Sequence, residues 1–274
     1  MKHVFLFFVL ILAIRPANAQ DYYTHTSLET AFKDPDAVYR LSLINKSLSS
    51  LPDSISRFRN LRELNLRNNA LTALPESIGE LTNLQRLYLM ENPLVTLPES
   101  IGNLDSLKGL DLSKTAIKML PNSIGDLDSL QWLFLNQSKL NKLPKSIGNL
   151  SNLRLLLLNK TNLKALPASV GNLAKLHLLE LPHTSVKRLP KSIKKLGKLN
   201  HLTLYSTPLK KLPSSLGALT NLKTLNLSKT AIKTLPRSIS RLRNLESLNL
   251  SDTPLKAGQL EKVTKALPQC PVSD

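Results

Sequence analysis

The residues best suited to chemistry lie in one short stretch, where three of the five histidines occur close to a carboxylate. His177, Glu180, His183 and His201 are of types that bind zinc or transfer protons, but a metal site needs ligands that converge on one point. If a strand runs through Glu180, His177 lies at its entrance and His183 beyond its exit, so the side chains diverge. The sequence also shows no phosphate-binding loop, paired-carboxylate signature or nucleophile elbow. We therefore expect no catalytic residues, no metal, no cofactor and no enzyme.

A repeat of 23 residues organises the chain and must position any functional side chain. Nine Leu-Pro pairs follow one another at this step without a break, from Leu51-Pro52 to Leu235-Pro236. A fixed period of this length predicts a stack of similar supersecondary units. Such stacks have long surfaces and rarely deep pockets, so the repeat favours binding over catalysis.

Each repeat predicts a very short strand followed by a tight return path. In the unit 74–96, the run Leu87-Tyr88-Leu89 alternates as a strand does. From Leu74 to Leu84 the apolar spacing is three or four, which is typical of a 3₁₀ turn or a short helix. The strand leucine recurs from Leu41 to Leu248, so we expect ten parallel strands above one continuous leucine core.

The pattern LxxLxLxxNxLxxLPxxIgxL resembles the leucine-rich repeat family, in its 23-residue class with a Leu-Pro step and with caps similar to those of bacterial secreted members. The resemblance covers residues 38–257. It implies an α/β repeat solenoid, a curved horseshoe with about ten short parallel strands on its concave face and 3₁₀ or short helical turns on its convex face. It also implies a binding role.

Two departures from the family pattern predict local differences. The asparagine position holds Asn69 and Asn92, then threonine or serine from Thr115 onward. A hydroxyl makes fewer hydrogen bonds than an amide, so we expect a slightly reshaped loop there. The glycine of the return path, which should ease the bend, is replaced by Ser56, Lys194 and Ser240, and at these positions we expect different turns.

The ends divide the chain into four segments: a signal peptide (1–19), an N-terminal helical cap (20–37), the repeats (38–257) and a C-terminal helical cap (258–274). The signal peptide follows from a short apolar run that ends at an Ala17-Asn18-Ala19 cleavage site. It predicts a secreted or periplasmic protein, and an uncleaved anchor is the alternative.

The two caps are predicted from short helical signals and from the cysteine content. Thr26 and Glu29 suggest a capping box that starts a helix, and Leu260 and Leu267 share one face of a second helix. Cys270 is the only cysteine, so no internal disulfide can form, which favours a bacterial protein. It is either a buried cap residue or a reactive thiol that pairs with another chain.

Residues that flank the strand leucines point away from the core, and in the middle of the chain they are apolar. They predict one exposed patch, beside which Gly109 leaves a notch. Exposed apolar patches that contain Trp and Tyr usually mark interaction sites, so we expect a protein partner. A homodimer, a self-associating envelope protein, or no function at all are the alternatives. The expected partner-binding residues are Tyr88, Met90, Trp132, Phe134, Leu155, Leu157, Leu178, His201 and Tyr205.

The net charge of +18 is concentrated in the second half of the chain. Residues 20–129 contain 11 Lys and Arg against 14 Asp and Glu, whereas residues 130–274 contain 24 against 5. A basic surface of this size predicts binding of an anionic glycan or lipopolysaccharide, or else a solvated face that keeps the protein soluble. Nucleic acid is the least favoured partner, because the basic half has few aromatic side chains for stacking. The candidate polyanion-binding residues, which share one repeat position, are Lys164, Lys187, Lys210, Lys233 and Lys256.

Overall fold

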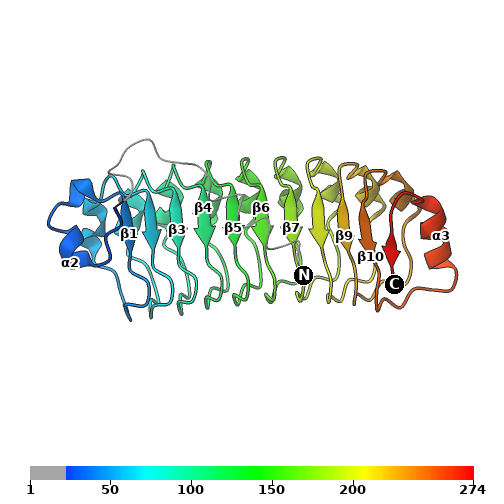
Figure 1. Cartoon of the computed structure of the whole chain (residues 1–274), viewed down its shortest axis with the longest axis horizontal. Helices are drawn as coiled ribbons and strands as arrows, with labels where there is room; N and C mark the ends of the chain where they lie inside the picture. Colours follow the sequence, from blue (N-terminus) through cyan, green and yellow to red (C-terminus); the bar gives the residue numbers. More distant parts are fainter. Residues whose placement is uncertain (1–22) are drawn as a thin grey trace.

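The computed structural model describes residues 23–274, an elongated solenoid with a single sheet of eleven parallel strands (Figure 1). The predicted signal peptide, residues 1–19, lies outside the described residues. The strands follow one another in sequence order, which confirms the predicted solenoid. They are β1 (Arg40–Ser42), β2 (Glu63–Asn65), β3 (Arg86–Tyr88), β4 (Gly109–Asp111), β5 (Trp132–Phe134), β6 (Leu155–Leu157), β7 (Leu178–Glu180), β8 (His201–Thr203), β9 (Thr224–Asn226), β10 (Ser247–Asn249) and β11 (Val272–Ser273).

The repeat sets the register of the sheet. From β1 to β10, equivalent residues of consecutive repeats face each other, so that Leu41 pairs with Leu64 and Leu64 with Leu87. The central leucine of each strand is buried in the core, and its two neighbours point to the opposite face, called here the sheet face. The sheet face is where the predicted binding residues lie.

A 3₁₀ turn of five residues follows every Leu-Pro step. Each proline precedes its turn with φ between −63° and −72°, the value that its ring imposes. The turns are η3 (Asp53–Arg57), η4 (Glu76–Glu80), η5 (Glu99–Asn103), η6 (Asn122–Asp126), η7 (Lys145–Asn149), η8 (Ala168–Asn172), η9 (Lys191–Lys195), η10 (Ser214–Ala218) and η11 (Arg237–Arg241). The prediction of different turns at Ser56, Lys194 and Ser240 is therefore wrong, because η3, η9 and η11 have the same type and length as the others.

The glycines of these turns serve close packing between repeats. A Cβ added to Gly79 would lie 2.4 Å from the backbone oxygen of Ser100, and one added to Gly148 would lie 2.4 Å from that of Ser169. Among the described glycines only Gly258 has a positive φ, so the expectation that glycine eases the bend is wrong. Neighbouring turns stack closely because this position carries no side chain.

The loop after each strand contains a left-handed residue at the same position along the whole solenoid. The φ of this residue lies between 53° and 60° from Asn45 to Asp252, and the first loop has a second left-handed residue, Ser47, with φ 52°. The next position carries Asn69, whose amide bonds five backbone groups, or a threonine such as Thr184, whose hydroxyl donates to the Leu181 carbonyl at 2.8 Å. The hydroxyl makes fewer bonds than the amide, and the loop differs as predicted: it is a bend before Asn69 and Asn92 but a hydrogen-bonded turn before each threonine or serine from Thr115 onward, with φ unchanged.

Short helices cover both ends of the leucine core (Figure 1). At the N-terminal end, α2 (Leu28–Ala31) and η2 (Pro35–Ala37) precede β1. Ser27 caps α2 by accepting a bond from the Thr30 amide at 3.2 Å, so the predicted capping box of Thr26 and Glu29 is wrong by one position. No helix within residues 23–274 is long and apolar enough to cross a membrane.

The C-terminal end has one more strand than the sequence predicts. Helix α3 (Gln259–Ala266) buries Val263 against the last repeat, and the chain then returns as β11 beside β10. Cys270 lies between the two, 5% exposed and unpaired. Burial raises the pKa of its thiol, which a backbone hydrogen bond from Leu248 partly offsets. These features fit a structural cap residue.

Candidate binding surface

The apolar residues of the sheet face form a second hydrophobic cluster, separate from the leucine core. We call it the aromatic cluster; its members are Tyr88, Trp132, Phe134, Leu155, Leu157 and Leu178, from β3 and β5–β7. The ring centroids of Trp132 and Phe134 are 4.8 Å apart, and those of Tyr88 and Trp132 are 5.8 Å apart. Both distances are typical of favourable aromatic contacts. The sheet therefore brings six of the nine predicted partner-binding residues into contact.

Gly109 in β4 makes this arrangement possible. A Cβ at Gly109 would lie 1.8 Å from Cζ2 of Trp132, so the indole ring occupies the space of a side chain at position 109. The predicted notch at Gly109 is filled by Trp132, and that part of the prediction is wrong. The ring bridges β4 and brings Trp132 close to Tyr88 on β3.

The centre of the aromatic cluster is less exposed than the sequence predicts. Trp132 is 7% exposed, and Phe134 and Leu157 are each 8% exposed. The expectation of an exposed patch is therefore wrong for these three, which pack against one another across strands about 4.8 Å apart. Leu155, Leu178 and Tyr88 are only half-buried, so they present the accessible part of the cluster.

Three predicted residues lie outside the aromatic cluster. Met90 follows β3 and is half-buried. His201, in β8, is half-buried as well, and burial lowers the pKa of its imidazole, with Lys223 acting in the same direction and Glu246 against it. Tyr205 instead forms a pair with His183, whose Nε2 lies 3.0 Å from the tyrosine oxygen.

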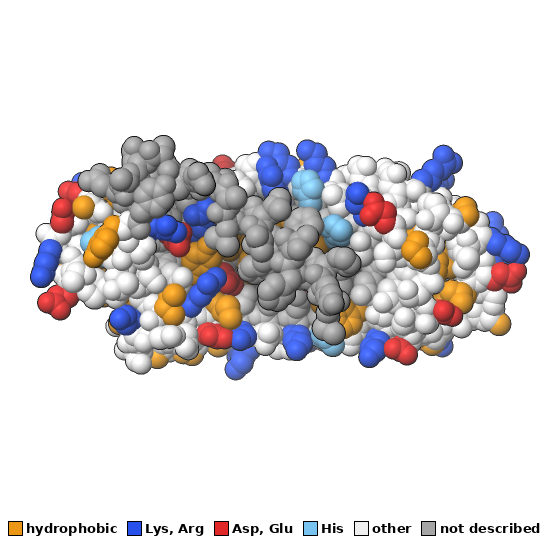
Figure 2. Space-filling view, in the orientation of Figure 1, with side chains coloured by type: hydrophobic (Ala, Val, Ile, Leu, Met, Phe, Trp, Pro, Cys, Tyr) orange, Lys and Arg blue, Asp and Glu red, His pale blue; other side chains and the backbone are white. Residues whose placement is uncertain are grey.

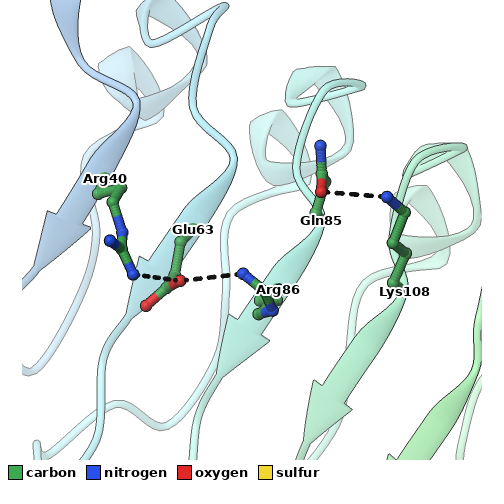
Figure 3. Close-up of polar contacts among 5 residues, drawn as sticks. All are labelled: Arg40, Glu63, Gln85, Arg86 and Lys108. Atoms are coloured by element: carbon green, nitrogen blue, oxygen red, sulfur yellow. Dashed lines mark hydrogen bonds and ion pairs between the residues drawn. The ribbon is translucent and has the colours of Figure 1, made fainter. Parts of the chain in front are cut away.

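Charged residues that the sequence reading did not select border the aromatic cluster at β1–β4. The guanidinium of Arg67 lies 4.3 Å from the ring centre of Tyr88 and 3.5 Å from the buried Asp111 carboxylate. Beside them, Glu63 pairs with Arg40 at 3.1 Å and with Arg86 at 3.4 Å (Figure 3). Opposite charges at equivalent positions of neighbouring strands are the signal that could have predicted the two pairs of Glu63.

Burial raises the pKa of Tyr88, and the Glu63 carboxylate adds to this effect, whereas Arg86 and Arg67 oppose it. Tyr88 therefore stays protonated at neutral pH, and its hydroxyl keeps a hydrogen to donate at the border between the charged and apolar parts of the sheet face. A ligand that meets this border can find both apolar contact and hydrogen bonding.

The predicted polyanion-binding lysines all lie on the surface. Lys164, Lys187, Lys210, Lys233 and Lys256 are exposed, each between a strand and the next repeat boundary. Figure 2 shows Lys and Arg side chains that project along both long edges of the molecule. This row is distinct from the aromatic cluster, so the two surfaces can be tested separately.

The histidines point to different partners. Nδ1 of His177 lies 2.6 Å from the Lys175 carbonyl, whereas His183 contacts Tyr205. Within residues 23–274, no group of three or more His, Cys, Asp or Glu side chains could hold a metal ion. The sheet face is therefore suited to binding a partner through its surface side chains.

Known structures share this architecture over most of the chain. A plant peptide hormone receptor, RGFR1 in complex with RGF2, is 29% identical with a TM-score of 0.64, over 94% of this chain and 47% of the receptor. The leucine-rich repeat domain of the type III effector XopL is 29% identical with a TM-score of 0.67, over 76% of this chain and 74% of that domain. A leucine-rich repeat protein of Leptospira interrogans covers 92% of this chain and all of its own length, but at 22% identity and a TM-score of 0.52 it supports the fold alone.

The chain spans about half the length of the plant receptor structure. None of the curated proteins matches it. The family described as "Leucine-rich repeat region" matches residues 39–112 and 144–207, and the one described as "Leucine rich repeat" matches residues 197–255. Proteins with this fold are typically non-catalytic scaffolds that bind proteins or peptides through the concave face of the sheet. Since the matched segments cover more than half of the sequence, the chain belongs to the leucine-rich repeat family.

Proposed function

We propose that this protein is a non-catalytic scaffold that binds a protein partner through its sheet face, with the aromatic cluster as the central contact. The observation that carries the proposal is the packing of Tyr88, Trp132 and Leu157 into one apolar unit on the side of the sheet opposite the leucine core. Within residues 23–274, no second layer of helices or strands lies over this side (Figure 1). Trp and Tyr that are held rigidly at an interface provide much of the binding energy.

The partner meets two kinds of surface side by side. Half-buried Leu155 and Leu178 offer apolar contact, and the arginines around Glu63 offer charge and hydrogen bonds. An apolar centre with a polar border is the usual anatomy of a protein interface. RGFR1, which is 29% identical to this chain, was solved in complex with RGF2, and this supports a protein or peptide as the ligand class.

We also propose that the mature protein is secreted or periplasmic in a bacterium. The proposal rests on the charged, apolar and small-residue pattern of residues 1–19. Fractionation of the source cells followed by N-terminal sequencing tests it, with Gln20 as the expected first residue. Recovery of the protein in membranes with Met1 or Lys2 at its N-terminus would instead show an uncleaved anchor.

The binding experiment compares a double variant inside the aromatic cluster with a double variant outside the strands. Trp132→Ala with Leu157→Ala changes the aromatic cluster, whereas Val95→Ala with Met119→Ala removes apolar side chains that are 54% and 60% exposed outside the strands. A partner captured from source extract is identified, purified and titrated with the wild-type chain and both variants. Loss of a central contact typically costs about 2 kcal/mol, which corresponds to roughly 30-fold weaker binding.

Salt distinguishes apolar recognition from charge attraction. Binding through the aromatic cluster should persist at high salt, because screening acts on charges. The proposal is wrong if the Trp132/Leu157 variant binds as well as the wild type, or if both variants lose affinity equally. Light scattering at increasing concentration covers self-association: a dimer that the Trp132/Leu157 variant abolishes would make a second copy of this chain the partner.

A further inference from the structure

A continuous row of cations runs along the loops of the solenoid from Lys118 to Lys256, away from the aromatic cluster. We call it the basic track; it is formed by two adjacent positions of the repeat, both on the stretch that leads from a strand to the next Leu-Pro step. Its nine members are all exposed. They are Lys118, Lys142, Lys164, Lys187, Arg188, Lys210, Lys211, Lys233 and Lys256.

The backbone fixes the spacing of the track. The amide of Asn141 donates to the carbonyl of Lys118 at 3.0 Å, and the amide of Lys256 donates to that of Lys233 at 3.0 Å. Met119 and Lys142 also form a parallel bridge. These bonds join neighbouring repeats at both ends of the track, and the register of the sheet repeats the track positions at steps of about 4.8 Å along its length. Six steps separate Lys118 from Lys256, so the track is roughly 30 Å long.

The charges of the track are not neutralised within the described chain. Neither position carries an Asp or Glu between residues 118 and 256. None of the ion pairs formed within residues 23–274 involves a member of the track, whereas Lys114, Lys223 and Lys265 elsewhere on the surface each pair with a glutamate. Like charges about 5 Å apart repel one another, so a bound polyanion would relieve a cost that the free protein carries.

We propose that the basic track binds a linear anionic polysaccharide, a ligand class separate from the protein partner of the sheet face. Its even steps suit a polymer with one acid group on successive sugars, laid across the repeats. Nucleic acid fits less well, because single strands bind better where aromatic side chains that stack on the bases accompany the charges. Between residues 118 and 256, neither position of the track is aromatic.

The test uses a size-defined heparin oligosaccharide as the probe and two triple variants with the same change in charge. Lys187→Gln, Lys210→Gln and Lys233→Gln interrupt the track, whereas Lys175→Gln, Lys198→Gln and Lys262→Gln remove three exposed lysines outside it. We expect at least about tenfold weaker binding at low salt for the track variant, and a slope of log affinity against log salt that is smaller by about 2. The control variant should change affinity less than about twofold.

The Trp132/Leu157 variant should bind heparin as the wild type does, which separates this proposal from that of the sheet face. An equal loss in both triple variants would show attraction to net charge alone and overturn the track. Tighter binding of a single-stranded oligonucleotide of equal charge, lost in the track variant, would overturn the polysaccharide in favour of nucleic acid. Circular dichroism confirms folding, and removal of the repulsion should leave Tm unchanged or slightly higher.

Discussion

The indole of Trp132 occupies the space of a side chain on Gly109, since a Cβ there would lie 1.8 Å from Cζ2 of the ring. The glycine on β4 and the tryptophan on β5 are adjacent in the sheet and 23 residues apart in the chain. The position of the central aromatic residue therefore depends on the absence of a side chain at its neighbour. With a side chain at position 109, the ring of Trp132 would point away from the sheet and would not reach Tyr88.

Gly109→Ala should displace the indole and destabilise the fold. Because an overfilled site forces side chains out of their preferred rotamers, we expect a loss of about 1–3 kcal/mol in the free energy of unfolding. Trp132 is the only tryptophan, so its fluorescence reports the displacement directly as a shift in emission. Gly197→Ala is the matched control, because a Cβ at Gly197 meets no atom within 4 Å. Identical emission from wild type and Gly109→Ala would show that the ring does not depend on the glycine.

Asn92→Thr should destabilise the solenoid more than Thr184→Val. The buried amide of Asn92 bonds the Leu71 amide and the Leu66 carbonyl of the preceding repeat, as well as the Leu89 carbonyl of its own. A threonine keeps only the bond within its repeat, which leaves the Leu71 amide unpaired at about 1–3 kcal/mol, whereas the Leu66 carbonyl loses one of its two bonds and keeps the one from Asn69.

Thr184→Val removes one bond, to the Leu181 carbonyl, at a cost of about 1 kcal/mol. Urea unfolding followed by circular dichroism measures both changes. Equal losses in the free energy of unfolding would contradict the cross-repeat role of Asn92, because the bonds from Asn92 to the preceding repeat would then add no stability.

His201 should make stability fall as the solution becomes mildly acidic. Burial lowers the pKa of His201 in the folded chain below its ordinary 6.5. The unfolded chain therefore takes up this proton first, so the free energy of unfolding decreases as pH falls below about 6.5 and levels off below the folded pKa. Above that range the residue contributes no pH dependence. His201→Gln should flatten this part of a Tm–pH curve, and an unchanged curve would rule the effect out.

Cys270 should react slowly with thiol reagents until the cap opens. It is 5% exposed, and burial raises the pKa of the thiol, so the reactive thiolate is both scarce and shielded. A chromogenic disulfide reagent should label the folded protein at least about tenfold more slowly than the urea-unfolded protein. Comparable rates would instead favour the reading of Cys270 as a reactive thiol.

The repeat architecture was predictable because each structural unit is encoded within its own 23 residues. Leucine periodicity locates the ten strands from β1 to β10, and the prolines locate the 3₁₀ turns. Strand β11 was not predictable in this way, since Val272 pairs with Leu248 through one short non-repeating return. A single copy carries no periodic signal.

The membership of the aromatic cluster was largely predictable, but its geometry was not. Alternation along a strand shows which side chains share the sheet face, so Trp132 and Leu155 could be grouped. Whether Trp132 stands upright or lies over Gly109 depends on contacts between strands, which one-dimensional patterns do not contain. The same limit explains why the burial of Phe134 and the pairing of Arg67 with Asp111 were not predicted.

The constant φ of the strand-exit loops has an evolutionary consequence. Asn68, Lys114, His183 and Ser206 share a left-handed φ despite their different chemistry. Duplication or deletion of a whole repeat would join loops with the same left-handed residue. Substitution of an exposed loop residue would leave the backbone unchanged. The side chains that contact a partner can therefore change from one repeat to the next, while the backbone that carries them stays the same.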